Sequence, residues 1–75
     1  MLHALKIESC FFEEIQKGNK RFEIRVNDRN FQLKDCLLLK EIDSNKEYTN
    51  RKLLVEVTYI CGYLQNENVV VLSIK

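Results

Sequence analysis

Residues 18–29 contain the side chains of this 75-residue chain whose types and spacing are best suited to chemistry. In an extended strand, Arg21, Glu23 and Arg25 share one face, because side chains alternate between faces. A glutamate between two arginines can hold the guanidinium of Arg25 in one direction, so that its planar donors meet a phosphate or a base edge. Lys20, just before this strand, supplies a point charge or a primary amine. The segment predicts a site for a phosphate or a base.

Two other interpretations of these charges stay open. Glu23 is a candidate general base if it lies in a buried environment. Alternatively, Arg21, Glu23 and Arg25 form a solvated ladder of charges, which contributes little to stability.

Cysteine and histidine content limits metal and cofactor chemistry. Cys10, Cys36 and Cys61 are odd in number and form no Cys-x-x-Cys pair, and His3 is the only histidine. A disulfide framework needs an even number of cysteines, and a zinc site needs paired ligands. We therefore expect no metal site, no cofactor and three reduced thiols that pack as small core residues.

Composition predicts an ordinary globular domain. Apolar residues make up 45% of the chain, charged residues make up 31%, and the net charge is +1. A charge this small excludes proteins that bind nucleic acid by bulk charge, so any nucleic-acid site depends on local arrangement. No apolar run approaches the ~20 residues of a membrane span, and the first residues lack the features of a signal peptide. We expect one soluble, cytoplasmic domain over residues 1–75, with no membrane partner.

The positioning elements begin with a strand and a helix. Residues 3–7 alternate as a short strand with Leu5 and Ile7 on one face. Ser9 is the predicted N-cap of a helix, and Gly18 is its left-handed stop. Three apolar residues at helical spacing are expected to face the core: Phe11, Phe12 and Ile15.

Four further strands follow. The first alternates with a period of two, so that Phe22, Ile24 and Val26 are expected in the core. The other predicted strands are Cys36–Ile42, Leu53–Cys61 and Val69–Ile74, separated by turns at residues 27–28 and 43–46 and by a loop at residues 62–68. The order is β-α-β-β-β-β.

This order predicts the architecture. Short connections between the late strands favour antiparallel pairing, because parallel neighbours need crossovers of a dozen or more residues. An open sheet would expose apolar edges such as Val69–Leu72 to aggregation, so we expect the sheet to close into a barrel with the helix at one end. The predicted class is α+β, mainly β: a small five-stranded, mostly antiparallel β-barrel with one early helix.

The charged segment also carries a family resemblance. Gly18, Lys20, Glu23 and Arg25 reproduce the G-x-K-x-x-E-x-R signature of the ASCH domains, relatives of the PUA RNA-binding domain. The flanking sequence, from HALKI to VVVLSIK, resembles the compact, often phage- or prophage-associated DUF3850 family over essentially the whole chain. The resemblance implies a PUA-like barrel that binds RNA or a nucleotide in a cleft where the helix meets the strands.

The resemblance also implies a role for each motif residue. Lys20 and Arg25 become candidate contacts to phosphate or base, Glu23 the residue that orients them, and Gly18 the structural corner that aims Lys20 into the cleft. Arg29 is expected at the rim, in the loop after the motif strand. The predicted RNA- or nucleotide-binding residues are Lys20, Arg21, Glu23, Arg25, Asn27 and Arg29.

One enzymatic branch of the ASCH domains offers an alternative. It resembles this chain in size and removes the acetyl group from N4-acetylcytidine. Its motif lysine, which corresponds to Lys20, is catalytic together with a threonine at the position of Glu23 and a later glutamate. Glu56 is the candidate for that glutamate here. The sequence departs from this branch at Glu23, so an amidohydrolase that uses Lys20 and Glu23 stays an alternative to the favoured binding module.

Other residues support secondary expectations. Tyr63 is a candidate stacking platform for a base, and Phe31 is expected to pin the loop after the motif to the core. Residues 50–52 are expected to form a solvated turn. A third possible function is a phage factor that binds a protein partner through an edge strand at Val69–Ile74.

Overall fold

The computed structural model describes residues 1–62 and 69–75. The elements are β1 (Leu2–Glu8), α1 (Ser9–Gln16), β2 (Phe22–Val26), β3 (Cys36–Ile42), β4 (Tyr48–Cys61) and β5 (Val69–Ile74). The predicted order is confirmed, and β3 and β5 have the predicted bounds. β4 begins at Tyr48 rather than Leu53, so residues 50–52 lie in a strand and the prediction of a turn there was wrong.

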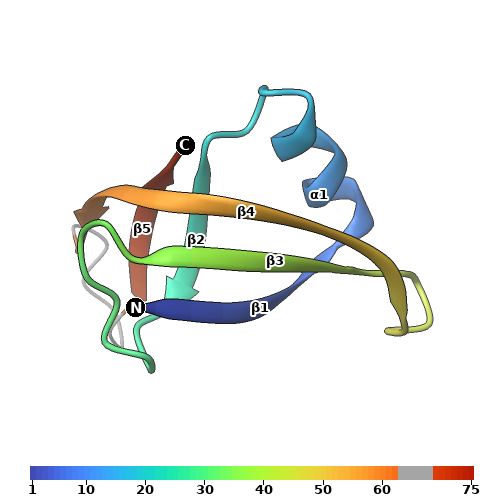
Figure 1. The fold of residues 1–75 in the computed structure, drawn as a ribbon, viewed down its shortest axis with the longest axis horizontal. Coiled ribbons are helices and arrows are strands. Elements are labelled where there is room, and N and C mark those ends of the chain that lie inside the picture. Colours follow the sequence, from blue (N-terminus) through green and yellow to red (C-terminus); the bar gives the residue numbers. More distant parts are fainter. Residues whose placement is uncertain (63–68) are drawn as a thin grey trace.

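The five strands form a mixed sheet in the order β1-β3-β4-β5-β2 (Figure 1). β1 and β3 are parallel, and the other three pairings are antiparallel. The parallel pair is possible because α1 and β2 lie between β1 and β3 in the chain and provide a long crossover. The domain is therefore small and mainly β, with one short helix.

The prediction of a closed barrel was wrong, because β1 and β2 are the two edges of the sheet and do not pair with each other. The apolar run of β5 was expected at an edge that needed protection, but β5 lies between β4 and β2 and is already paired on both sides. Closure was not required to cover it.

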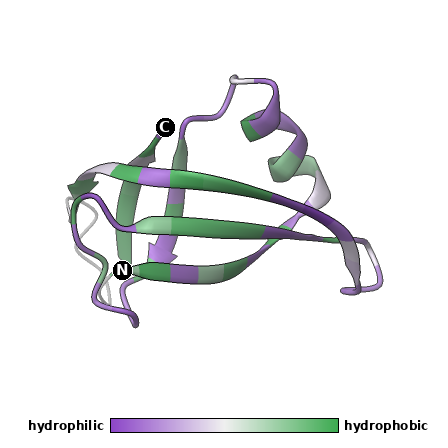
Figure 2. Cartoon of the chain, in the orientation of Figure 1, coloured by the Kyte–Doolittle hydropathy of each residue, from purple (hydrophilic) through white to green (hydrophobic). Residues whose placement is uncertain are grey.

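The core lies on the inward faces of the strands, under α1. Figure 2 shows apolar residues concentrated along β3 and β4 and polar residues predominating in the turns. From α1, Phe12 and Ile15 are buried, whereas Phe11 is 47% exposed, contrary to the prediction. Gly18 has a φ of +84°, which confirms the left-handed stop.

Ser9 does not cap the helix as predicted. Glu8 is the N-cap residue, and it makes no side-chain capping hydrogen bond. The Ser9 hydroxyl instead donates to the Ile42 carbonyl at 3.0 Å. The first residue of α1 thus attaches the helix to the end of β3.

β2 presents the opposite face from the one predicted. Phe22, Ile24 and Val26 are 41%, 54% and 55% exposed, whereas Glu23 is only 5% exposed. A period of two fixes the alternation of side chains but not which set faces inward. Here Phe31, from the loop after β2, fills the core position: it is buried and its ring makes an edge contact with His3, as expected for a residue that pins this loop.

The three thiols are free, but none is buried. Cys10 is exposed, and Cys36 and Cys61 are half-buried. The expectation that they pack as core residues was wrong: Cys10 occupies an exposed position of α1, and the buried positions of β3 and β4 are occupied mainly by larger aliphatic side chains.

Candidate functional site

Lys20, Glu23 and Arg25 form one hydrogen-bonded group, which we call the Glu23 cluster. Oε1 of Glu23 accepts from Nζ of Lys20 at 2.7 Å, and Oε2 accepts from Nε of Arg25 at 3.0 Å. The Glu23 side chain is 6% exposed, while those of Lys20 and Arg25 are 16% and 26% exposed. This burial rules out the solvated ladder of charges. The cluster has two cations and one carboxylate, which favours an anionic ligand.

The corner between α1 and β2 places Lys20. After the left-handed Gly18, the backbone N–H groups of Asn19 and Lys20 donate to the Glu14 carbonyl at 2.9 and 3.1 Å. Nζ of Lys20 also donates to the Phe22 carbonyl at 2.7 Å. The ammonium is therefore fixed between two acceptors, close to the turn that carries it.

Two exposed aromatic rings complete the surroundings of Lys20. Its Nζ lies 4.7 Å from the ring centroid of Phe22 and 5.3 Å from that of Phe11. A cation at these distances is attracted by the face of an aromatic ring. The two phenylalanines that the sequence placed in the core thus line the site instead.

A pocket of about 410 Å³ opens over the Glu23 cluster. Besides the cluster, it is lined by Lys6, Ile7, Glu8, Phe11, Phe22 and Ile24. Within the described residues, Lys20 uses two of its three ammonium hydrogens and Arg25 uses two of its five N–H donors. Both cations therefore retain donors for a ligand in this pocket.

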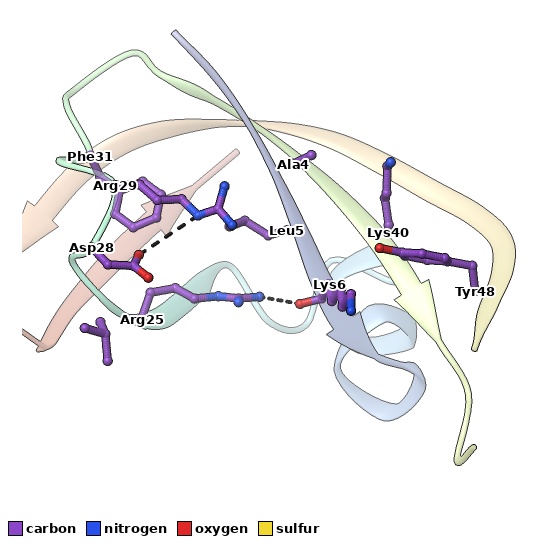
Figure 3. Close-up of a pocket in the computed structure, with 10 residues that line it drawn as sticks. Ala4, Leu5, Lys6, Arg25, Asp28, Arg29, Phe31, Lys40 and Tyr48 are labelled. Atoms are coloured by element: carbon purple, nitrogen blue, oxygen red, sulfur yellow. Dashed lines mark hydrogen bonds and ion pairs between the residues drawn. The ribbon is translucent and has the colours of Figure 1, made fainter. Parts of the chain in front are cut away.

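Arg25 joins this pocket to a second one of about 480 Å³. Its Nη2 donates to the Lys6 carbonyl at 2.7 Å, so that a side chain links the two edge strands (Figure 3). Lys6 and Arg25 line both pockets. Arg29 lines the second pocket, with its Nε 4.0 Å from a carboxylate oxygen of Asp28. Arg25 and Arg29 therefore line the same pocket.

Two other predicted binding residues lie outside these two pockets, although Arg21 lines a third pocket of about 250 Å³ together with Lys20. Nε of Arg21 donates to the Gly18 carbonyl at 3.1 Å, and Arg21 lines neither of the two pockets. Oδ1 of Asn27 accepts from the Phe31 backbone N–H at 2.9 Å, which shapes the loop rather than the pocket.

Two candidates for other functions are not part of the cluster. Glu56 is exposed on β4 and lines neither pocket, so the structure does not bring it to Lys20. Tyr63, the predicted stacking residue, lies outside the described residues.

Sequence reasoning missed a second charged group, which we call the Glu41 cluster: Glu13, Glu41, Thr49 and Arg51. Arg51 donates to both oxygens of Glu41 at 2.8 Å and also to Glu13 on α1. Its guanidinium lies 4.9 Å from the ring centroid of Phe12. The hydrogen bonds from Arg51, and then that from Thr49, lower the pKa of the buried Glu41 to about 2. Glu41 in turn raises the pKa of Arg51. This cluster ties the helix to the sheet.

A signal for Glu41 was present in the sequence. Leu37 and Leu39 face the core, and a period of two places Glu41 on the same inward face of β3. A carboxylate at such a position needs a cationic partner.

A third carboxylate, Asp35, was also missed. It is buried and accepts from the ring of His3 at 2.8 Å, from the amine of Met1 at 2.9 Å and from the Gln32 backbone N–H at 3.0 Å. The hydrogen bond with His3, followed by those from the amine and from Gln32, lowers the pKa of Asp35 to about 2. Asp35 therefore connects the start of β1 to the loop before β3 through hydrogen bonds.

Over residues 1–62 and 69–75, no three potential ligand side chains gather as a metal site would require. In the same part of the chain, no helix has the length and apolar character of a membrane span.

Fold and site together define a small mainly-β domain with a buried glutamate between two cations. Residues 2–74 match the family described as a domain of unknown function, DUF3850, and the chain belongs to this family. It is also similar to an uncharacterised 12.9 kDa protein from the GpA 3′ region of Escherichia phage P2, with 33% identity over 68 residues. That match covers 87% of this chain and 62% of the phage protein, so the chain spans about three fifths of that relative.

Proposed function

We propose that this protein binds RNA or a nucleotide in the pocket over the Glu23 cluster. The observation that carries the proposal is the buried carboxylate of Glu23, which fixes two cations that both retain free N–H donors. Charge-assisted hydrogen bonds from such fixed donors suit phosphate oxygens and base edges. The resemblance of the motif to that of the ASCH domains, and a cytoplasmic location, belong to the same proposal.

The arrangement favours binding over catalysis. Glu56, the candidate for the later glutamate of an amidohydrolase, is exposed on β4 outside both pockets. Glu8 is the second carboxylate that lines the pocket of Lys20, and it is an exposed residue at the end of β1. The protein-binding alternative relied on β5 as an edge strand, and β5 is an inner strand of the sheet. The match to a phage protein supports the phage-related character of the chain and leaves its ligand to experiment.

The test is an amide NMR titration with short single-stranded RNA oligonucleotides, cytidine and N4-acetylcytidine. We expect shifts at residues 18–29, and a loss of affinity of about tenfold in both Lys20→Ala and Arg25→Ala, as one charge-assisted contact is removed in each. Matched controls are Lys17→Ala and Arg21→Ala, which remove the same charges nearby but outside this pocket.

Two outcomes would contradict the proposal. Equal affinity in the wild type and in both cluster variants would show that the pocket is not the binding site. Release of acetate from N4-acetylcytidine, abolished by Lys20→Ala, would establish the amidohydrolase instead.

A further inference from the structure

A row of lysines crosses the outer face of the sheet beside the second pocket. Lys6 on β1 is in register with Lys40 on β3, and Lys40 is in register with Lys52 on β4. Their chain neighbours Leu39 and Leu53 pack in the core, which places the lysines on the opposite face. We call Lys6, Lys40 and Lys52 the lysine row. Since adjacent strands lie ~4.8 Å apart, the row presents three positive charges over ~10 Å.

The three like charges repel one another in the protein alone. The repulsion is most direct between Lys40 and Lys52, which lie opposite each other in the antiparallel pair of β3 and β4, where like charges destabilise a sheet. Within residues 1–62 and 69–75, no carboxylate forms an ion pair with any member of the lysine row. An extended anionic ligand would relieve the repulsion.

An exposed tyrosine indicates what kind of anion this is. Tyr48 is 54% exposed, and its ring centroid lies 5.8 Å from Nζ of Lys6 and 5.6 Å from Nζ of Lys40. Both ammonium groups are within cation–π distance of the ring. A positively charged surface with an exposed aromatic side chain is the usual platform on which single-stranded nucleic acids stack a base. A peptide of glutamates alone has no flat ring to stack there.

The second pocket connects this surface with the Glu23 cluster. Figure 3 shows Arg25 and Arg29 on one side of β1 and Lys40 with Tyr48 on the other. All four residues line the same pocket of about 480 Å³, and Tyr48 continues into a pocket of about 180 Å³ beside Lys52. A positively charged path therefore runs from the Glu23 cluster over β1 to β4.

We propose that the lysine row and Tyr48 extend the site, so that the ligand is a single-stranded RNA of several nucleotides rather than one nucleotide. This inference rests on the proposed function: one nucleotide occupies the pocket over the Glu23 cluster, and the rest of the strand follows the path over β1. Tyr48 stacks on a base, and the lysine row contacts the phosphates.

The test compares uridine monophosphate with oligouridylates of increasing length, up to a nonanucleotide, by calorimetric titration at several salt concentrations. We expect affinity to rise with length. The double variant Lys40→Gln/Lys52→Gln should weaken binding of the nonanucleotide about tenfold and leave the monophosphate unchanged. Because each contacted phosphate of a single strand contributes about 0.7 to the slope of log K against log salt, this slope should become shallower by about 1.4. Tyr48→Ala should also weaken binding of the nonanucleotide only.

The matched control is Lys34→Gln/Lys46→Gln, which removes two charges from exposed turns away from both pockets. If the control variant weakened binding of the nonanucleotide as much as Lys40→Gln/Lys52→Gln does, the loss would come from the lower net charge alone. That result would overturn the inference. Affinity independent of length, with binding still lost in Lys20→Ala, would overturn the inference and leave the proposed function standing. Failure of every RNA to bind would overturn both. Binding of polyglutamate as tightly as the nonanucleotide would overturn the choice of a nucleic acid.

Discussion

Two glutamates of this domain, Glu23 and Glu41, are both almost completely buried, and both accept hydrogen bonds from an arginine. Their surroundings differ. Glu23 divides its oxygens between two cations that face pockets, so its cluster has an excess of positive charge. Glu41 gives both oxygens to Arg51, which also binds Glu13 on the helix, so that cluster has an excess of negative charge.

This difference separates a site from a structural connection. The hydrogen bonds of the Glu41 cluster connect α1, β3 and β4, and Arg51 donates to two carboxylates of the protein. The Glu23 cluster spans only six positions of the chain, and its two cations keep donors available although Arg25 also donates to the Lys6 carbonyl on β1. Substitutions in the two clusters should therefore affect different properties: stability in one and affinity in the other.

The largest effect is expected for Arg51→Met. The change leaves the carboxylate of Glu41, which is 3% exposed, without its cation and should lower the free energy of unfolding by about 3 kcal/mol. Urea unfolding monitored by circular dichroism measures this loss. Affinity of the folded fraction for uridine monophosphate should not change, because Arg51 does not line the pocket over the Glu23 cluster.

Two further variants sharpen this prediction. Arg29→Met removes a half-exposed arginine with one distant partner and should have little effect on stability. The double variant Glu41→Met/Arg51→Met should be more stable than Arg51→Met, because no unpaired buried charge remains. A double variant less stable than Arg51→Met would contradict the assignment.

The second largest effect is expected at acidic pH. Asp35 and Glu41 have pKa values of about 2 in the folded protein, below the ordinary values of 3.8 and 4.5. At pH values between the folded and the ordinary pKa values, the unfolded chain binds more protons than the folded protein does. The free energy of unfolding therefore rises with pH in this range. The stabilisation is thus complete above about pH 4.5 and is lost as the pH falls towards 2.

Urea unfolding at a series of pH values from neutral to acidic measures this dependence. In Glu41→Met/Arg51→Met the free energy of unfolding should fall less steeply as the pH is lowered, since Asp35 still contributes to this fall and Glu41 does not. A decline as steep as that of the wild type would show that Glu41 does not take part.

A smaller effect on stability is expected for Glu23→Gln. The side chain keeps its size, and Lys20 and Arg25 are both partly exposed, so water can solvate them once the carboxylate is lost. We expect a loss of about 1 kcal/mol in the free energy of unfolding, together with an RNA affinity reduced about tenfold by misplaced cations. If Glu23→Gln lost as much stability as Arg51→Met and kept its RNA affinity, the Glu23 cluster would have a structural role as well.

The smallest effect is expected for Lys40→Gln, which should stabilise the protein, whereas the preceding variants destabilise it. Removing the central charge of the lysine row relieves repulsion with Lys6 and Lys52 and should raise the free energy of unfolding by about 0.5 kcal/mol. Urea unfolding at low salt detects the gain, which high salt should remove. A destabilised variant would show that the row has a structural role.

Much of the fold could be predicted from local signals. Apolar runs next to turn and loop signals predicted the bounds of β3 and β5, and Gly18 ends the helix where expected. The faces of β2 could not be predicted, since inverting the alternation leaves the pattern unchanged and only the pairing with β5 decides it. The open sheet was missed for the same reason: strand order depends on contacts between distant segments.

The sequence by itself determined the element order and the proximity of Lys20, Glu23 and Arg25, because these depend on residues only a few positions apart. The tertiary structure decided that Glu23 is buried, that Arg51 reaches Glu41, and that three lysines align across three strands. Each of these depends on strand register and burial, which arise only when segments far apart in the chain pack together.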